Sequence, residues 1–398
     1  MNERSDKMKR GLRVMEIMPL ANSAINFIGD QLSFLKEKGG YEMHLVSTPN
    51  DGIYDFVERE GATYYPMVIP RAIKPYRDIV NMWKIFRYVR KHNIDVVIGH
   101  QSKGILYGML PGKLGGAKYR IVLAHGVLED TMVGMKQKIF ATENKIMSGF
   151  ATHVLCVSPS VMRRRVELGI DKPDNQCILG KGTCNGVNAL NKFNPQNVPV
   201  EVTDAIREKY GLSSDDYVVG FCGRLVRDKG ITELAGAIRL IKEQHPEIPL
   251  KLFVIGMLEK RDALPAETVN FLKESDSVVF TGRVEYSEIQ NYYTVMDAFI
   301  LPSYREGFPT VVLEASAMEL PLIVSRSTGC IDSIIENETG VYCDITPESI
   351  ADSILTFYDK EKAKSFGQAA RRFVVENFEH TKVKALMLDL LNNITTKE

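Results

Sequence analysis

The stretch that decides the fold runs from Leu301 to Gly329 and reads LPSYREGFPTVVLEASAMELPLIVSRSTG. A short apolar run, Ala298 to Leu301, leads into it and predicts a buried strand. From Thr310 the apolar residues recur at helical spacing, and Pro321 ends this helix. A second apolar run at 322–325 predicts another buried strand. The order strand, loop, helix, strand presents the N-terminus of a helix, whose free N–H groups and dipole favour an anion.

Two glutamates flank this predicted helix end. Glu306 lies in the loop, and Glu314 follows eight positions later, about two turns into the helix. Carboxylates accept hydrogen bonds from sugar hydroxyls, so an anion site between them suits a nucleotide sugar. The alternative is a surface loop with solvated glutamates, because a pair of glutamates at one separation is common.

A second loop combines glycine with two cations. Phe221 to Gly230 reads FCGRLVRDKG and joins a predicted strand to a predicted helix. Gly223 allows a sharp turn, after which Arg224 and Lys229 can converge on one anion. The alternative is a pair of solvated surface cations, which are common on proteins.

Two histidines lie at predicted strand ends in the first half of the chain. His125 follows the strand at 120–124, and His100 follows the strand at 95–99. Ligands of open α/β sheets bind at the carboxyl ends of strands, so His125 is a candidate for the reacting centre and His100 for a substrate contact. The alternative for His125 is a structural histidine that is hydrogen-bonded in a turn.

The length of the chain indicates two domains. At 398 residues it exceeds one typical domain, and its formal net charge of zero argues against bulk binding of nucleic acid. Strands alternate with helices throughout, which predicts an α/β fold with parallel sheets. Six cysteines without a C-x-x-C spacing favour buried free thiols.

Targeting and metal signals are sparse. The charged N-terminal stretch 1–13 lacks the apolar core of a signal peptide, and no apolar run reaches the ~18–20 residues of a membrane span. We therefore expect a cytoplasmic protein. The sequence contains no Asp-x-Asp, so no metal site is predicted, and two cations with a helix dipole could stabilise a leaving diphosphate instead.

These motifs together resemble the family 4 retaining glycosyltransferases. The E-x7-E pattern of Glu306 and Glu314, the G-R-L…K-G segment at 223–230 and the N-G-V-N…F-N-P segment at 185–195 carry the resemblance. It implies catalytic or sugar-facing roles for Glu306, Arg224, Lys229 and His125. It also implies donor contacts from Glu314 to the ribose, from the Gly307 and Phe308 amides to the sugar or diphosphate, and from the Val284 backbone to the base.

The resemblance implies two Rossmann-like domains facing across a cleft, the B-type glycosyltransferase fold. We place the acceptor-side domain at 1–198, the donor domain at 199–378 and a C-terminal helix at 379–398 that packs on the first domain. The implied reaction is retaining transfer of a hexose-type sugar from a nucleoside diphosphate sugar, with UDP as the expected nucleotide, to a hydroxyl of a glycan or lipid-linked acceptor. No cofactor is implied beyond this donor substrate.

Two other functions fit parts of the pattern. A nucleotide-sugar epimerase can share the two-domain form, and a catalytically silent nucleotide-sugar binder could keep Glu314 and Arg224. The presence of both Glu306 and His125 favours the transferase.

Two regions depart from the simplest form of this hypothesis. The loop after the first strand has only Gly29 where the family usually has a glycine pair. Arg163, Arg164 and Arg165, with Lys136, Lys138 and Lys145, could form a basic face for peripheral contact with anionic lipid, although charge runs usually only solvate a helix.

Overall fold

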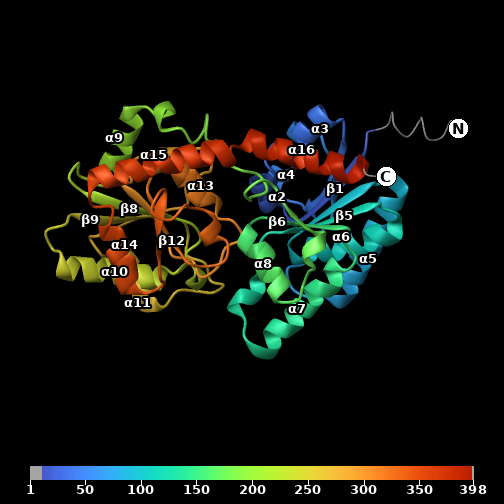
Figure 1. Cartoon of the computed structure of the whole chain (residues 1–398), viewed down its shortest axis with the longest axis horizontal. Helices are drawn as coiled ribbons and strands as arrows, with labels where there is room; N and C mark the ends of the chain where they lie inside the picture. Colours follow the sequence, from blue (N-terminus) through green and yellow to red (C-terminus); the bar gives the residue numbers. More distant parts are fainter. Residues whose placement is uncertain (1–10, 397–398) are drawn as a thin grey trace. The chain divides into compact units, whose positions relative to one another are not determined.

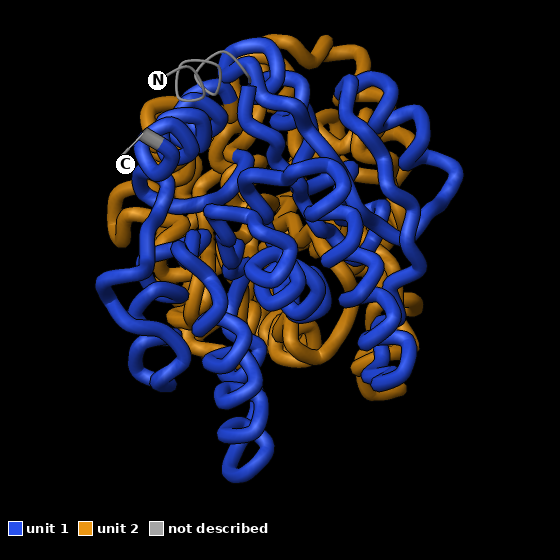
Figure 2. Tube along the Cα trace, turned by 90° about the vertical axis from the view of Figure 1, so that its right-hand side faces the viewer, with its two compact units in different colours: residues 1–185, 381–398 blue, residues 186–380 orange. Residues whose placement is uncertain are grey.

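The computed structural model describes residues 11–396 (Figure 1). The prediction that the N-terminal stretch 1–13 is not a signal peptide rests largely on residues 1–10, which lie outside the described range. By its contacts the chain divides into two compact units, Met1–Asn185 with Thr381–Glu398, and Gly186–His380 (Figure 2). Each unit is an α/β sheet structure, which confirms the predicted fold class.

The first unit is built on a seven-stranded sheet in the order β3-β2-β1-β4-β5-β6-β7, and every registered pair is parallel. The strands are β1 (Arg13–Leu20), β2 (Glu42–Thr48), β3 (Thr63–Pro66), β4 (Val96–His100), β5 (Tyr119–Ala124), β6 (His153–Cys156) and β7 (Gln176–Ile178). The helices are α2 (Ala21–Ile28), α3 (Gln31–Gly39), α4 (Asp51–Glu60), α5 (Pro75–His92), α6 (Gln101–Gly115), α7 (Gly134–Ser148), α8 (Pro159–Glu167) and α16 (His380–Thr396).

The second unit has a six-stranded parallel sheet in the order β10-β9-β8-β11-β12-β13. The strands are β8 (Tyr217–Cys222), β9 (Leu250–Ile255), β10 (Val278–Gly282), β11 (Ala298–Leu301), β12 (Leu322–Ser325) and β13 (Gly340–Cys343). The helices are α9 (Val200–Lys209), α10 (Ile231–Gln244), α11 (Ala266–Glu274), α12 (Ile289–Tyr293), α13 (Thr310–Ala317), α14 (Pro347–Leu355) and α15 (Lys360–Asn377).

Each sheet has one point where the strand order reverses. In the first unit β1 lies beside β4, and in the second β8 lies beside β11. The loops that leave two such neighbouring strands diverge to opposite sides of the sheet, which opens a crevice at their carboxyl ends. Three of the four motifs described above follow β4, β8 and β11 at these ends, and the fourth, His125, follows β5, the neighbour of β4.

The division between the units falls earlier than the predicted boundary at residue 198. Val187, Ala189 and Phe193 belong to the core of the second unit, where they are at most 3% exposed. Glu379 holds this segment, because its carboxylate accepts from the Ala189 amide at 2.9 Å. The apolar side chains of this turn-rich segment pack in the core of the second unit, so the chain enters that unit before residue 198.

Two predicted helices differ from those in the structure. The sequence predicts one helix over 22–38 that ends at the glycine pair 39–40, but the structure divides it into α2 and α3 at Gly29, which has a positive φ of 57°.

The apolar spacing of residues 78–92 predicts an inward helix face that includes Ile79, Trp83 and Val89. In α5 Val89 is buried, but Ile79 and Trp83 are 66% and 54% exposed. The buried face instead contains Asp78, whose carboxylate accepts from Lys103 Nζ at 2.7 Å, together with Ile85.

No helix within residues 11–396 combines the length and the apolar character that crossing a bilayer requires.

Candidate active site

Two loops meet at the reversal point of the second sheet: the β8 loop, residues 223–230 between β8 and α10, and the β11 loop, residues 302–309 between β11 and α13. Gly230 ends the β8 loop with φ 68°, and a Cβ at this position would lie 2.1 Å from the Pro302 carbonyl oxygen. Only glycine therefore permits this approach. The hydroxyl of Ser303 donates to the Asp228 carbonyl oxygen at 3.0 Å and joins the two loops.

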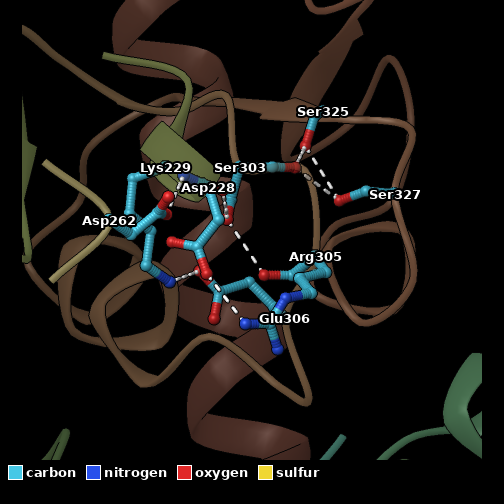
Figure 3. A network of polar contacts seen from close by, with 8 residues as sticks. All are labelled: Asp228, Lys229, Asp262, Ser303, Arg305, Glu306, Ser325 and Ser327. Atoms are coloured by element: carbon cyan, nitrogen blue, oxygen red, sulfur yellow. Dashed lines mark hydrogen bonds and ion pairs between the residues drawn. The ribbon is translucent and has the colours of Figure 1, made fainter. Parts of the chain in front are cut away.

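Figure 3 shows the polar network that results. Lys229 of the β8 loop forms an ion pair with Glu306 of the β11 loop, and both side chains are mostly buried, at 14% and 16% exposure. A second ion pair lies beside it, because Arg305 Nη2 donates to Asp228 Oδ2 at 3.0 Å. Asp228 Oδ1 and Arg305 Nε are buried and have no hydrogen-bond partner within the described part of the chain. The network therefore retains unused capacity to donate and to accept hydrogen bonds.

The structure thus brings together two of the predicted residues, Lys229 and Glu306. Arg224 has a different environment: its side chain is 59% exposed and pairs with Glu259 at 3.3 Å. The convergence of Arg224 with Lys229 on one anion stays a prediction. Gly223 has φ 156°, and its carbonyl oxygen packs against Gly256, where a Cβ would lie only 1.8 Å away.

Helix α13 begins at Thr310, directly after the β11 loop. Gly307 and Phe308 precede it, so their amides lie next to the helix end, where N–H groups lack intrahelical partners. The Phe308 ring packs on Phe378 with centroids 5.1 Å apart. A ligand contact of Phe308 would therefore come from its backbone amide.

Glu314 is buried within α13, with 4% exposure. The Tyr293 hydroxyl donates to its Oε2 at 2.9 Å. Burial raises the pKa of this carboxyl to about 7, and the hydrogen bond from Tyr293, the charge of Lys192 and the hydrogen bond from Tyr286 oppose this rise. Glu314 is therefore poised between the neutral and the ionised form near neutral pH.

Lys192 and Tyr286 were not predicted from the sequence. The Lys192 ammonium lies 3.2 Å from the centroid of the Tyr286 ring and donates to the Tyr286 carbonyl oxygen. Burial lowers the pKa of Lys192 to about 8, against the opposing charge of Glu314. The available signal was the position of Lys192 inside the turn-rich 185–195 segment. Val284 is half-buried on the second unit's core, and the structure shows no contact that bears on its predicted role.

The two predicted histidines meet in the first unit. His100 Nδ1 and His125 Nε2 are 3.0 Å apart at the ends of β4 and β5. His100 is 3% exposed, and its two ring nitrogens contact His125 and Glu16. Its ring nitrogens are therefore already occupied by protein groups, and it is placed to hold the His125 ring rather than to contact a substrate. Burial and the neighbouring His100 lower the pKa of His125 to about 3, which keeps this imidazole neutral at physiological pH.

Within residues 11–396 no cluster of three or more histidine, cysteine, aspartate or glutamate side chains has the arrangement of a metal site. The second unit therefore offers ion pairs and amides at a helix end, and the first unit, by itself, offers a neutral imidazole.

Two family models match the chain, one on each unit. Residues 202–373 match the model described as "Glycosyl transferases group 1", and residues 35–178 match the "Glycosyl transferase 4-like domain". The chain belongs to the family 4-type glycosyltransferases. It is a transferase of the kind found in polysaccharide biosynthesis, in agreement with the sequence-based hypothesis.

Curated relatives cover nearly the whole glycosyltransferase. The capsular polysaccharide biosynthesis glycosyltransferase CapM of Staphylococcus aureus is 29% identical over 360 residues, which is 90% of this chain and 91% of the relative. An Escherichia coli UDP-Gal:alpha-D-GlcNAc-diphosphoundecaprenol alpha-1,3-galactosyltransferase is 23% identical over 95% of this chain and 97% of its own.

Solved structures agree on the fold. The Anabaena protein HepE, crystallised with UDP and glucose, has a TM-score of 0.78 at 14% identity and covers 96% of this chain and 100% of its own. A glycosyltransferase from Rickettsia africae has a TM-score of 0.77 at 21% identity, with 98% and 100% covered. The B-type glycosyltransferase fold is therefore confirmed.

Proposed function

We propose that this glycosyltransferase moves a hexose-type sugar, with retention, from a UDP-linked donor to a hydroxyl of a lipid-linked glycan, without a metal ion. The observation that carries this proposal is the contact of Lys229 with Glu306 at the reversal point of the second sheet, beside the N-terminus of α13. A cation and free amides suit a diphosphate, and a neighbouring carboxylate suits sugar hydroxyls.

The relatives support the donor and acceptor classes. The E. coli relative is named for UDP-Gal and for a sugar attached to diphosphoundecaprenol. A Campylobacter jejuni relative, 23% identical over 74% of this chain and 75% of its own, is named for a diphospho-undecaprenol-linked sugar. The structural neighbour HepE was crystallised with UDP and glucose.

In the proposed mechanism each group has a separate task. Lys229 and the amides at the start of α13 would stabilise the negative charge that grows on the leaving diphosphate. Arg224 would join them when its exposed side chain leaves Glu259. Glu306 would hold the sugar, Glu314 the ribose hydroxyls, and His125 would orient the sugar. The leaving phosphate would accept the proton from the acceptor hydroxyl in a front-face displacement.

The direct test is a transfer assay with radiolabelled UDP-sugars and a polyprenyl-diphosphate-linked sugar, in the presence of EDTA. We expect one donor to give an α-linked product that chromatography separates from free sugar. Transfer only after addition of a divalent cation would contradict the metal-free mechanism. Release of an epimerised nucleotide sugar without any acceptor would instead identify an epimerase.

The pKa of Glu314 predicts how donor affinity depends on pH. Ribose hydroxyls donate to the carboxylate, so binding requires the ionised form, and at pH 6 about one-tenth of a carboxyl with a pKa near 7 is ionised. The affinity for an intact UDP-sugar should therefore rise about five- to tenfold between pH 6 and 7.5. Calorimetric titration measures this change.

Glu314→Gln is the matched control, because it keeps the shape of the side chain but does not titrate. Its donor affinity should be weaker and independent of pH. A wild-type pH profile in the Gln variant would remove Glu314 from the ribose site.

The same pKa affects stability. The carboxyl binds its proton more tightly in the folded state, so its contribution is present at low pH and is lost as pH rises from the ordinary value of 4.5 to about 7.

The basic face proposed for membrane contact is smaller than the sequence suggested. Arg164 pairs with Asp130 and Glu167, at 2.6 and 3.0 Å, and Arg165 is buried against Asp171. Helix α7 keeps three exposed lysines next to exposed apolar side chains. These residues are Lys136, Lys138 and Lys145, with Val133, Met135, Ile139 and Ile146. An amphipathic helix of this kind suits an anionic lipid surface.

We therefore expect Ile139→Glu to reduce co-sedimentation with vesicles that contain anionic lipid, because the change adds negative charge to the apolar side of α7. Val200→Glu is the control, since Val200 is also well exposed, at 70% against 58% for Ile139, but lies on the second unit. Equal binding by both variants and the wild type would exclude α7 as the contact surface.

A further inference from the structure

The outer face of α5 in the first unit combines exposed cations with exposed apolar side chains. Between residues 71 and 91 all seven basic residues are exposed. They are Arg71, Lys74, Arg77, Lys84, Arg87, Arg90 and Lys91. The one acidic residue of this segment, Asp78, is buried and pairs with Lys103. The segment therefore carries a large excess of positive charge in a chain whose formal net charge is zero.

These cations have no carboxylate partner. Within residues 11–396 none of the seven forms an ion pair, and the Arg87 guanidinium lies instead 4.7 Å from the centroid of the Trp83 ring. Two open hollows of about 490 and 530 Å³ lie along the same face. Tyr65 and Lys84 line both hollows, and no carboxylate lines either. The face is thus free to attract a negatively charged partner.

An apolar stripe lies on the side of α5 that points away from the core. Ile85 and Val89 are buried and mark the inward side of the helix. Tyr76, Ile79 and Trp83 recur at three- and four-residue spacing and are 81%, 66% and 54% exposed. With about 3.6 residues per turn, these three side chains lie opposite the buried ones. The segment before the helix adds two more exposed apolar side chains, which are Val68 and Ile73.

The two parts of this face need a partner that is both apolar and negatively charged. A soluble polyanion would pair with the cations but leave the apolar stripe in water. A second copy of the chain would bring the same seven cations against this face, and like charges repel. At the boundary of an anionic bilayer both needs are met, because tryptophan and tyrosine rings prefer the head-group layer and basic side chains bind anionic head groups.

The position of α5 relates this face to the crevice of the first sheet. Because crossovers between parallel strands are right-handed, α5 lies on the same side of the sheet as α6, opposite α3 and α4 (Figure 1). The ion pair of Asp78 with Lys103 joins the N-terminal end of α5 to the start of α6, and α6 begins directly after His100. The face therefore starts beside the crevice and extends away from it along α5.

We propose that the outer face of α5, from Arg71 to Lys91, binds the surface of a bilayer that contains anionic lipid. The stripe of Tyr76, Ile79 and Trp83 enters the head-group layer, and the cations beside it pair with lipid phosphates. This contact holds the crevice of the first sheet at the membrane, where a lipid-linked acceptor would present its sugar. Only that last consequence rests on the proposed function. The contact expected of α7 is separate, because it involves another helix.

Trp83 reports this contact directly, because it is the only tryptophan of the chain. The wild-type protein is titrated with vesicles of equal parts phosphatidylglycerol and phosphatidylcholine. We expect the fluorescence of Trp83 to shift to shorter wavelength, and brominated acyl chains in the same vesicles to quench it. Vesicles of phosphatidylcholine alone and inorganic pyrophosphate should leave the spectrum unchanged.

Three results of this titration would overturn the proposal. The first is that the protein does not bind the anionic vesicles. The second is that it sediments with them while the fluorescence of Trp83 is neither shifted nor quenched, so that another surface makes the contact. The third is that pyrophosphate alone gives the full spectral shift, which would identify a site for a soluble phosphate instead of a membrane surface.

A double substitution tests the cations. Lys84→Ala with Lys91→Ala should weaken binding to the anionic vesicles about 25-fold, since each basic side chain near such a surface contributes about fivefold. Lys364→Ala with Arg372→Ala is the matched control, because it removes two exposed cations from α15 of the second unit. The control should bind like the wild type. Equal binding by the two double variants would contradict the role of α5.

A transfer assay tests the consequence for the acceptor. The ratio of transfer in anionic vesicles to transfer in detergent micelles should fall about tenfold in the α5 double variant and stay unchanged in the α15 control. An unchanged ratio in the α5 double variant would contradict the positioning of the crevice at the membrane. If the wild type transfers no sugar in either setting, the proposed function fails, and the fluorescence titration still decides whether α5 binds the membrane.

Discussion

Lys229→Ala should lower kcat by about 10²-fold or more. Lys229 is a mostly buried cation of the β8 loop, in an ion pair with Glu306. In the proposed mechanism it stabilises the negative charge that grows on the leaving diphosphate. Steady-state kinetics at saturating donor measures the effect. Lys229→Met keeps the length of the side chain without its charge and should lose as much activity.

Arg239→Ala is the matched control, because this arginine also pairs with a glutamate, Glu267, but on the exposed surface of the same unit. It should retain wild-type kcat. Arg224→Ala should show an effect close to that of Lys229→Ala if the exposed guanidinium moves onto the diphosphate. Wild-type activity in both Lys229→Ala and Arg224→Ala would remove the β8 loop from the site.

Gly329→Ala should lower kcat/KM by about 10²-fold, although residue 329 has no assigned chemical role. Gly329 has φ 81°, and a Cβ there would lie 2.5 Å from the Gly307 carbonyl oxygen and 2.6 Å from that of Glu306. The β11 loop would have to shift, and displacement of a catalytic group by about 1 Å can cost this much. Kinetics and thermal unfolding together measure the two consequences.

The control for backbone strain is Gly211→Ala. Gly211 has a similar φ of 64° in the same unit, but a Cβ there meets nothing within 4 Å. Both variants should lose stability from the positive φ, Gly329→Ala more because its Cβ also meets backbone, and only Gly329→Ala should lose activity. Parallel losses of activity would show that strain, rather than the position of the β11 loop, limits the enzyme.

Local patterns predicted the elements that carry the site. Proline, glycine and apolar spacing were sufficient to place the strand–loop–helix unit around Glu306, because each signal lies within a few residues of the element that it defines. The carboxyl ends of neighbouring strands then explain why Lys229 and Glu306 meet, although they are 77 positions apart.

Long-range partners explain what the sequence did not reveal. Glu16 lies in the apolar strand β1, and nothing near it in the sequence indicates a polar partner. Its hydrogen bond with His100 spans 84 positions. The inward face of α5 was predicted only in part, because it also contains Asp78, whose ion-pair partner Lys103 lies on α6. Lys192 was missed for the same reason, since its neighbour Tyr286 lies 94 positions away.

The ion pair between Asp228 and Arg305 has a consequence for engineering donor specificity. It joins the β8 loop to the β11 loop, next to the contact of Lys229 with Glu306. Grafting either loop alone from a relative with another donor would leave one of these mostly buried charges unmatched, which is strongly destabilising. Libraries that exchange both loops together, or that vary residues 228 and 305 as a coupled pair, should therefore yield far more folded chimeras than libraries that exchange one.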